Sequence, residues 1–173
     1  MDKTATKSYR AGFRTPSKRG LVVRVTTLLD CRPERAWEEV QKPNLMRYVA
    51  APLIHFEAVN PPELPERWKE GEYLVRLKLF GVLSLGTQWI GIEFPPDHTP
   101  GVSYQMRDNG HGQLMRVWDH LITIEPTPDG RTRYTDRVEV NAGLLTPLAW
   151  VFARLFYRHR QRRWCKLAGR NFV

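Results

Sequence analysis

Between residues 72 and 142 the sequence alternates strand-like runs with short turns, and this pattern constrains the fold more than any other feature. The expected strands are 73–79, 82–94, 102–107, 114–124 and 132–140. The segments PPDHTPG, DNGHG and PTPDG between them have the composition of turns. Because links this short join antiparallel neighbours, the sequence predicts a meandering antiparallel sheet.

The flanking segments add two strands and three helices. Residues 21–29 are rich in β-branched side chains and predict a first strand. Two short helices are expected next, with Pro33 in the first turn of one of them, and 53–59 returns to strand character. A helical pattern then runs from about residue 144 to 167. Since such a helix can cover one face of an antiparallel sheet, we expect an α+β fold.

Charge divides the chain into a tail and one domain. The net charge is +9, and residues 1–19 hold six basic residues against one acidic residue. We interpret 1–19 as a basic flexible tail and 20–173 as a single domain, which 173 residues suit. Two isolated cysteines and the lack of an apolar leader or of a run of about 20 apolar residues predict a cytoplasmic protein.

The terminal helix combines apolar and basic residues. At 100° per residue, one side collects the residues that we expect to face the sheet: Leu145, Leu148, Ala149, Phe152, Leu155 and Phe156. The basic residues of 154–170 are spread around the helix rather than aligned, which argues against nucleic-acid binding. His159 and Arg163 fall on the apolar side. Either the helix extends past the sheet there, or these two residues face a cavity that contains acceptors.

Three segments together resemble the START/Bet v 1-like superfamily (SRPBCC), especially its polyketide cyclase/dehydrase-like bacterial members. They are CRPERAWEEVQKPNLMRYVAAP, GQLMRVWDHLITIEPTPDGRTRYTDRVEV and LFYRHRQRRWCKLA. The resemblance implies a helix-grip fold, in which a curved antiparallel sheet of about seven strands wraps around the long C-terminal helix. It also implies two short helices after the first strand and an elongated cavity between sheet and helix. Members of the superfamily bind or transform lipids, isoprenoids and aromatic polyketides.

Two polar residues of the expected sheet are candidates for chemistry. Alternation in the strand at 114–124 puts Trp118 and His120 on one face, so His120 either enters the cavity or is a hydrogen-bonded structural residue. Asp136 can pair with Arg163 or His159 across the cavity, or form a structural ion pair with the helix.

The sequence contains no HExxH, CxxC, P-loop or GxGxxG motif, so we expect neither metal nor cofactor.

Three functions remain open. The leading hypothesis is that the cavity binds an apolar small molecule, lined by Tyr104, Trp118, His120, Phe152, Phe156, His159 and Arg163. The second is a cofactor-free polyketide cyclase or dehydratase that uses His120, Asp136 and Arg163 as its acid–base set. The third is a surface module whose basic ends contact an anionic membrane or nucleic acid. The distribution of the arginines argues against nucleic acid. The sequence does not predict the oligomeric state.

Overall fold

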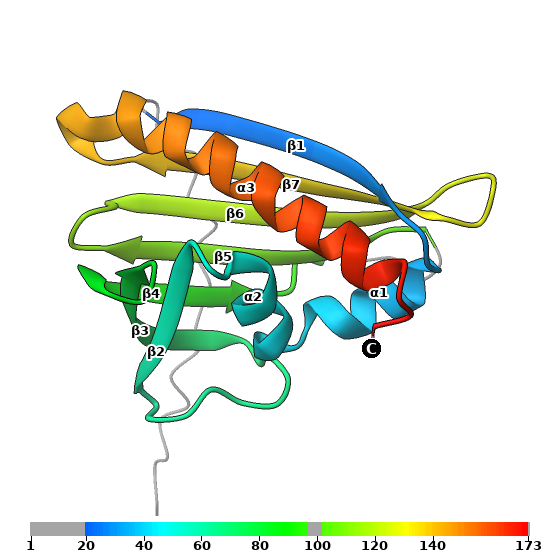
Figure 1. Cartoon of the computed structure of the whole chain (residues 1–173), viewed down its shortest axis with the longest axis horizontal. Coiled ribbons are helices and arrows are strands. Elements are labelled where there is room, and N and C mark those ends of the chain that lie inside the picture. The colour runs from blue at the N-terminus through cyan, green and yellow to red at the C-terminus, as the bar shows by residue number, and fades with distance from the viewer. Residues whose placement is uncertain (1–19, 97–101, 173) are drawn as a thin grey trace, which may run out of the picture.

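The computed structural model describes residues 20–96 and 102–172 and has the predicted element order. The elements are β1 (Leu21–Leu29), α1 (Pro33–Val40), α2 (Pro43–Ala50), β2 (Ile54–Asn60), β3 (Gly71–Leu79), β4 (Leu83–Glu93), β5 (Tyr104–Gly112), β6 (Val117–Pro126), β7 (Thr132–Asn141), the 3-10 turn η1 (Gly143–Leu145) and α3 (Thr146–Ala168) (Figure 1). The prediction of an α+β fold with a seven-stranded antiparallel sheet, two short helices after the first strand and a long C-terminal helix is confirmed.

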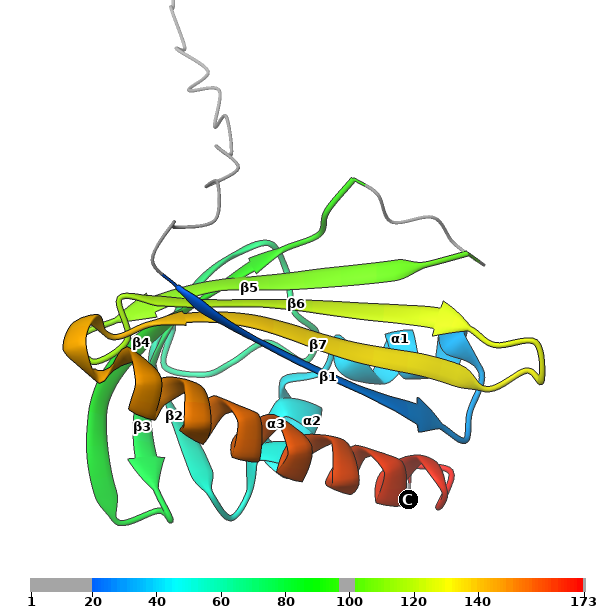
Figure 2. The ribbon, with the colours of Figure 1, turned by 90° about the horizontal axis from the view of Figure 1, so that it is seen from above.

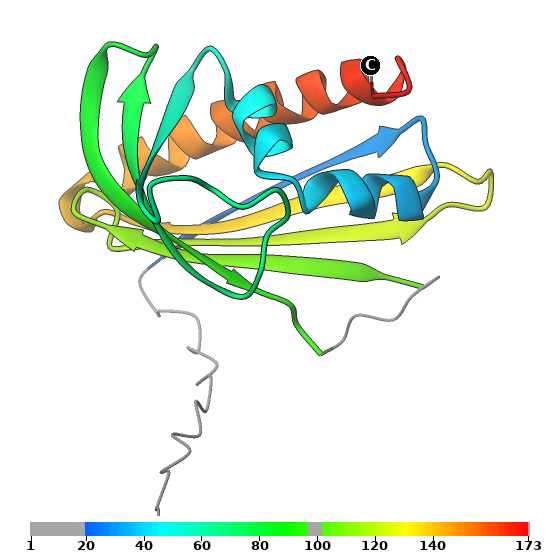
Figure 3. The ribbon, with the colours of Figure 1, turned by 90° about the horizontal axis from the view of Figure 1, so that it is seen from below.

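The sheet is open, with the strand order β1-β7-β6-β5-β4-β3-β2. β1 and β2 are therefore its two edges, although only α1 and α2 separate them along the chain. β2, β3 and β4 bend toward α3, and α1 and α2 lie on the same side of the sheet as α3 (Figure 3). A register shift between Arg76 and Lys78 in β3 and the positive φ of Gly86 (85°) in β4 accompany this curvature.

One predicted turn proved to be part of a strand. DNGHG has turn composition, yet Asp108 to Gly112 form the second half of β5. The glycines of this segment allow close strand contact instead: a Cβ on Gly110 would lie 2.9 Å from the carbonyl oxygen of Trp89. His111, expected in a turn, stacks beside the Trp89 ring, with the two ring centroids 6.5 Å apart. Glycine here marks a close approach of two backbones rather than a chain reversal.

α3 lies across one face of the sheet, along β1 (Figure 2). Its buried side is centred on Ala149, Ala153, Tyr157, Gln161 and Trp164. The expectation that Leu145, Leu148 and Leu155 face the sheet was wrong, because these residues are 52%, 67% and 61% exposed. The first half of α3 is apolar on nearly every side, so its periodicity does not distinguish the inner face from the outer one.

The core consists of two apolar clusters. One surrounds the ends of α1 and α3 and contains Trp68, Tyr134 and Trp164. The other lies under the first half of α3 and contains Trp118, Phe156 and Tyr157. None of the helices within the described ranges is long and apolar enough to cross a membrane.

Candidate functional site

A small internal cavity lies between the concave face of the sheet and the first half of α3. Its volume is about 80 Å³. The residues that line it are Met46, Ile54, Phe56, Val75, Leu77, Leu85, Thr87, Gln88, Ile90, Asp108, Leu114, Met115, Trp118, Phe152, Phe156, Tyr157 and Arg160. Side chains therefore fill most of the elongated hollow that the resemblance implied. The remaining space has apolar walls and two ionisable residues of opposite type, Asp108 and Arg160.

Arg160 lines this cavity and has a buried donor without a partner. Its Nε is buried and has no hydrogen-bond partner. Its guanidinium carbon lies 4.9 Å from the centre of the Tyr157 ring and 5.8 Å from that of Phe156. Contacts with ring faces stabilise a cation only modestly and do not use its N–H donors. Donation from Arg160 Nε to an anionic group in the cavity therefore requires neighbouring side chains to move and expose that atom.

Asp108 lines the same cavity from β5. Its Oδ1 accepts a hydrogen bond of 2.9 Å from the backbone N–H of Gly91. Burial raises the pKa of Asp108 to about 7, although the Gly91 bond and the charge of Arg160 both lower it. Near pH 7 a large fraction of Asp108 is consequently neutral and does not compensate the positive charge of Arg160.

Two aromatic residues form the inner wall of the cavity. Trp118 Nε1 donates to the Tyr157 hydroxyl over 3.2 Å, and the two rings stack with centroids 6.1 Å apart. Burial raises the pKa of Tyr157, so its hydroxyl stays protonated. The His120 ring also packs against Tyr157, at 4.8 Å between ring centroids. Tyr157 thus lines the cavity and also contacts His120, which does not line it.

Asp136 does not line the cavity, and its carboxylate joins β6, β7 and α3. It accepts hydrogen bonds from His120 Nε2 (2.7 Å), the Tyr134 hydroxyl (3.0 Å) and Gln161 Nε2 (2.8 Å). Gln161 Nε2 also donates to the carbonyl oxygen of Val25 over 2.8 Å. Buried polar groups that are satisfied in this way fix the packing of α3 against β1, β6 and β7.

The protonation states of this network follow from its burial. Burial lowers the pKa of His120, which is only partly offset by Asp136, so the imidazole is neutral. Burial alone would raise the pKa of Asp136, but the bond from His120 and the other donors outweigh it and lower that pKa. A neutral His120 therefore donates its Nε2–H to an ionised Asp136.

The predicted lining residues divide into two groups. Trp118, Phe152 and Phe156 line the cavity, whereas His120 does not. Tyr104 lies in the other core cluster, where its ring stacks on Trp37 with centroids 5.5 Å apart. Strand alternation alone is compatible with Tyr104 belonging to either apolar cluster, because both clusters lie on the same face of the sheet.

His159 and Arg163 bind α2 instead of lining the cavity. His159 Nε2 lies 2.8 Å from the carbonyl oxygen of Ala51, and Arg163 Nε donates over 2.8 Å to that of Tyr48. These carbonyls belong to the C-terminal end of α2, where unpaired acceptors favour basic partners. The sequence left two explanations open: a helix that extends past the sheet, or a cavity that contains acceptors. Both residues do have acceptors, but these are carbonyl oxygens at the end of α2 and not groups in the cavity. Arg163 is consequently not brought to His120 and Asp136.

Sequence reasoning missed Asp108, Tyr157, Arg160 and Gln161. Tyr157 and Gln161 continue the four-residue spacing of Ala149 and Ala153, which was the available signal for the inner face of α3. That spacing was hidden by the bulkier apolar residues around it. Within the described parts of the chain, no group of three His, Cys, Asp or Glu side chains is placed to hold a metal ion.

Comparisons with known proteins show the family and the fold. The model of a family described as a domain of unknown function (DUF8410) matches residues 27–168. No curated protein matches the chain.

Several solved bacterial structures are similar in fold. The protein TTHA0849 from Thermus thermophilus superimposes with a TM-score of 0.63 at 12% identity, covering 88% of this chain and 100% of its own. A protein from Arthrobacter aurescens gives 0.61 at 16% identity, with 87% of each chain covered. Ms6760 from Mycobacterium smegmatis gives 0.60 at 15% identity, covering 91% of this chain and 96% of its own. At such identities the similarity concerns the fold alone.

Proposed function

This chain belongs to the DUF8410 family, a domain of unknown function, and we propose that it binds an apolar small molecule carrying one acidic group. The binding place is the cavity between α3 and the sheet. The observation that carries the proposal is the position of Arg160, whose buried Nε has no partner. Leaving a buried donor of a charged group unpaired is costly, so an anion at this place stabilises the folded protein.

The remaining lining of the cavity fits the apolar part of such a ligand. Apart from Thr87, Gln88, Asp108 and Arg160, its walls are aliphatic, aromatic or methionine side chains, with the Trp118 indole and Tyr157 hydroxyl paired to each other. Few convergent polar groups in an apolar pocket are typical of small-molecule sites.

The volume of the cavity limits the ligand. A cavity of about 80 Å³ is smaller than the roughly 150 Å³ that accommodates benzene. A ligand of the lipid, isoprenoid or polyketide class therefore requires lining side chains to move. Met46 and Met115 are suited to this, because the unbranched thioether side chain changes conformation at low cost.

The cyclase alternative lacks an assembled acid–base set. It requires His120, Asp136 and Arg163 around one ligand, but Arg163 donates to the backbone of α2. His120 is 4% exposed and does not line the cavity. We therefore propose binding rather than catalysis as the function of this cavity, and a structural role for the His120–Asp136 pair.

Native mass spectrometry of freshly purified protein, followed by organic extraction, tests the proposal. We expect a co-purified compound with an apolar body and an acidic group. A series of apolar carboxylic acids should also bind at least about tenfold more tightly than their methyl esters, because a charge-assisted hydrogen bond to Arg160 contributes about 1.5–3 kcal/mol.

Arg160→Gln and Arg158→Gln form a matched pair for this experiment. Both remove one guanidinium from α3, but Arg158 is exposed on the outside of the helix. We expect Arg160→Gln to lose the preference for acid over ester and Arg158→Gln to keep it. Wild-type protein that carries no compound and binds neither acids nor esters would refute the proposal.

A further inference from the structure

The side of α3 that points away from the sheet has two chemically different halves. It comprises Leu144 in η1, then Leu148, Val151, Leu155, Arg158, Arg162 and Lys166. We call these seven residues the outer face of α3. Their spacing of three and four residues keeps them in one line along the helix. The first four are aliphatic and the last three are basic.

The aliphatic half is unusually exposed to solvent. Leu144 is fully exposed, and Leu148, Val151 and Leu155 are each 47% or more exposed as well. Four adjacent aliphatic side chains on one helix face form a continuous apolar surface rather than scattered contacts. Contiguous apolar surface of this kind marks a site of association, because leaving it in water is unfavourable.

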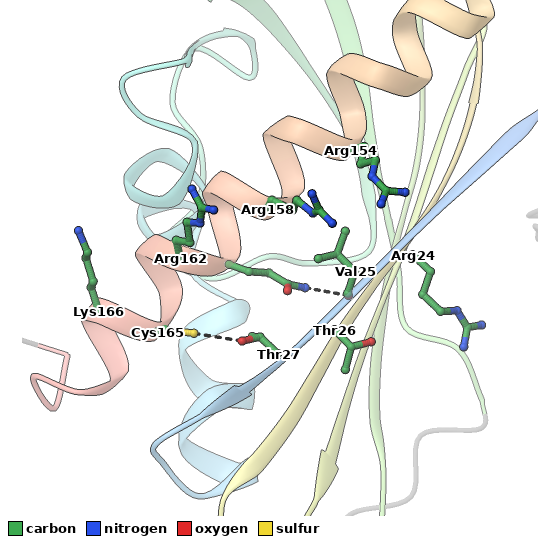
Figure 4. A pocket seen from close by; sticks show the side chains of 10 residues that line it. Arg24, Val25, Thr26, Thr27, Arg154, Arg158, Arg162, Cys165 and Lys166 are labelled. Carbon is green, nitrogen blue, oxygen red and sulfur yellow. Dashed lines mark hydrogen bonds between the residues drawn. The ribbon is translucent and has the colours of Figure 1, made fainter.

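The basic half borders an open groove between α3 and β1. The groove has a volume of about 660 Å³, and five of its ten lining residues are the cations Arg24, Arg154, Arg158, Arg162 and Lys166. None of the described residues that line it is acidic. In Figure 4, Arg154 and Arg158 extend from α3 on the side of β1, whereas Arg24 comes from β1 itself. The Arg24 side chain points away from α3 in this view, so the positive charge at the groove comes from α3.

We propose that the outer face of α3 docks on an anionic phospholipid bilayer. The aliphatic half enters the boundary between headgroups and acyl chains, and the groove receives headgroup phosphates. A helix with aliphatic residues and a basic face is suited to lie in the plane of such an interface. Each basic residue near an anionic membrane adds attraction, and apolar burial adds a contribution that salt does not screen.

Other partners fit this surface less well. A nucleic acid would use the cations, but the neighbouring residues are aliphatic, and bases stack on aromatic rings. A second copy of the chain in a twofold contact would cover the leucines, but it would leave the basic half without an anionic partner. An anionic bilayer offers an apolar region for the aliphatic half and phosphates for the basic half.

The proposal is independent of what the cavity binds. Phe152 and Phe156 of α3 line the cavity, whereas Leu148, Val151 and Leu155 of the same turns are outside it. Docking through the outer face of α3 therefore uses none of the residues that line the cavity.

Flotation of the full-length chain with lipid vesicles tests the proposal. We expect binding to vesicles of phosphatidylcholine mixed with phosphatidylglycerol and little binding to phosphatidylcholine alone. Arg158→Gln, Arg162→Gln and Lys166→Gln together should weaken partitioning about 100-fold, from roughly 1 kcal/mol per basic residue. Leu148→Ser with Leu155→Ser should weaken it about tenfold, and the remaining binding should become more sensitive to salt.

Controls separate this surface from other basic regions. Replacement of Lys3, Lys7 and Arg10 by Gln removes the same amount of charge from the N-terminal segment and should leave most of the binding. Arg160→Gln should leave binding unchanged, because Arg160 lines the cavity. The proposal is overturned if the outer-face variants bind vesicles like the wild type, if the N-terminal variant alone loses binding, or if only an oligonucleotide binds.

Discussion

At the scale of single residues, the arginines of α3 have three different roles despite their similar appearance in the sequence. Arg160 enters the cavity, Arg163 donates to the end of α2, and Arg158 borders the groove beside β1. A displacement of two or three positions along a helix moves a side chain by about 200° or 300° around its axis, which follows from 3.6 residues per turn. The function of each arginine is therefore set by its neighbours and not by its type.

Asp136→Asn tests the buried network. Asp136 accepts three hydrogen bonds, and an amide in its place would direct its own NH₂ toward at least one of the three donors. We expect the free energy of unfolding to fall by about 3 kcal/mol, measured by urea denaturation. Asp129→Asn, in an exposed turn, should change it little. Equal stability of wild type and Asp136→Asn would mean that this network is not formed.

Asp108 gives a pH dependence of defined sign. Its pKa rises from 3.8 to about 7 on folding, so the folded state binds the proton more tightly and its stability falls as pH increases between those values. For a fully buried group the change is about 4 kcal/mol, and the partial exposure of Asp108 reduces the expected value to about 2 kcal/mol.

Asp108→Asn should remove this dependence. Relative to the wild type, we expect the variant to be similarly stable at about pH 5 and more stable at about pH 8, in urea denaturation at both pH values. Comparing the two proteins at each pH cancels the contribution of His120, which has the opposite sign because its pKa is lowered by burial. If the difference in the free energy of unfolding between wild type and Asp108→Asn stays constant across this pH range, the raised pKa of Asp108 is contradicted.

At the scale of elements, α3 combines a closely packed inner side with an uncovered outer side. Ala149 and Ala153 are 4% and 0% exposed, so the helix approaches the sheet through small residues. The leucines that would ordinarily form such an inner side are outside. This distribution is what distinguishes α3 from a helix whose only role is to cover the core.

Ala153→Leu tests that close approach. A larger side chain at a fully buried position forces the helix or its neighbours to shift, and we expect a loss of about 1–3 kcal/mol in the free energy of unfolding. Val151→Leu, two residues earlier on the exposed side, should change it by less than about 0.5 kcal/mol. If thermal and urea denaturation show the same stability for both variants, α3 does not pack on the sheet through the side that contains Ala153.

The sequence predicted the elements well and the orientation of α3 only partly. Strand alternation and short turns depend on local residue patterns, so the sheet was predictable, except where DNGHG continued β5. The inner side of α3 depends on which surface the sheet offers, and an apolar helix half with leucines on several sides fits more than one rotation. Asp108 and Arg160 meet only because β5 and α3 converge at one cavity, which no local pattern encodes.

At the scale of the whole molecule, α3 separates two surfaces with different proposed partners. Its inner side closes a cavity in which Arg160 Nε is unpaired, and its outer side carries aliphatic and basic halves beside an open groove. Both proposals therefore involve one helix but different residues of it. This arrangement predicts that ligand binding and membrane binding respond to separate substitutions.

The combined variant of Arg160→Gln with Leu148→Ser and Leu155→Ser tests that separation. We expect its loss of selectivity for acidic ligands to equal that of Arg160→Gln, and its loss of vesicle binding to equal that of the leucine pair. The effects should add within about 0.5 kcal/mol, because no residue is shared between the two sets. Both quantities are measured on the same preparations, by ligand titration and vesicle flotation. A marked deviation from additivity would mean that α3 moves as a unit when either partner binds, so that occupancy of the cavity and attachment to the membrane are coupled.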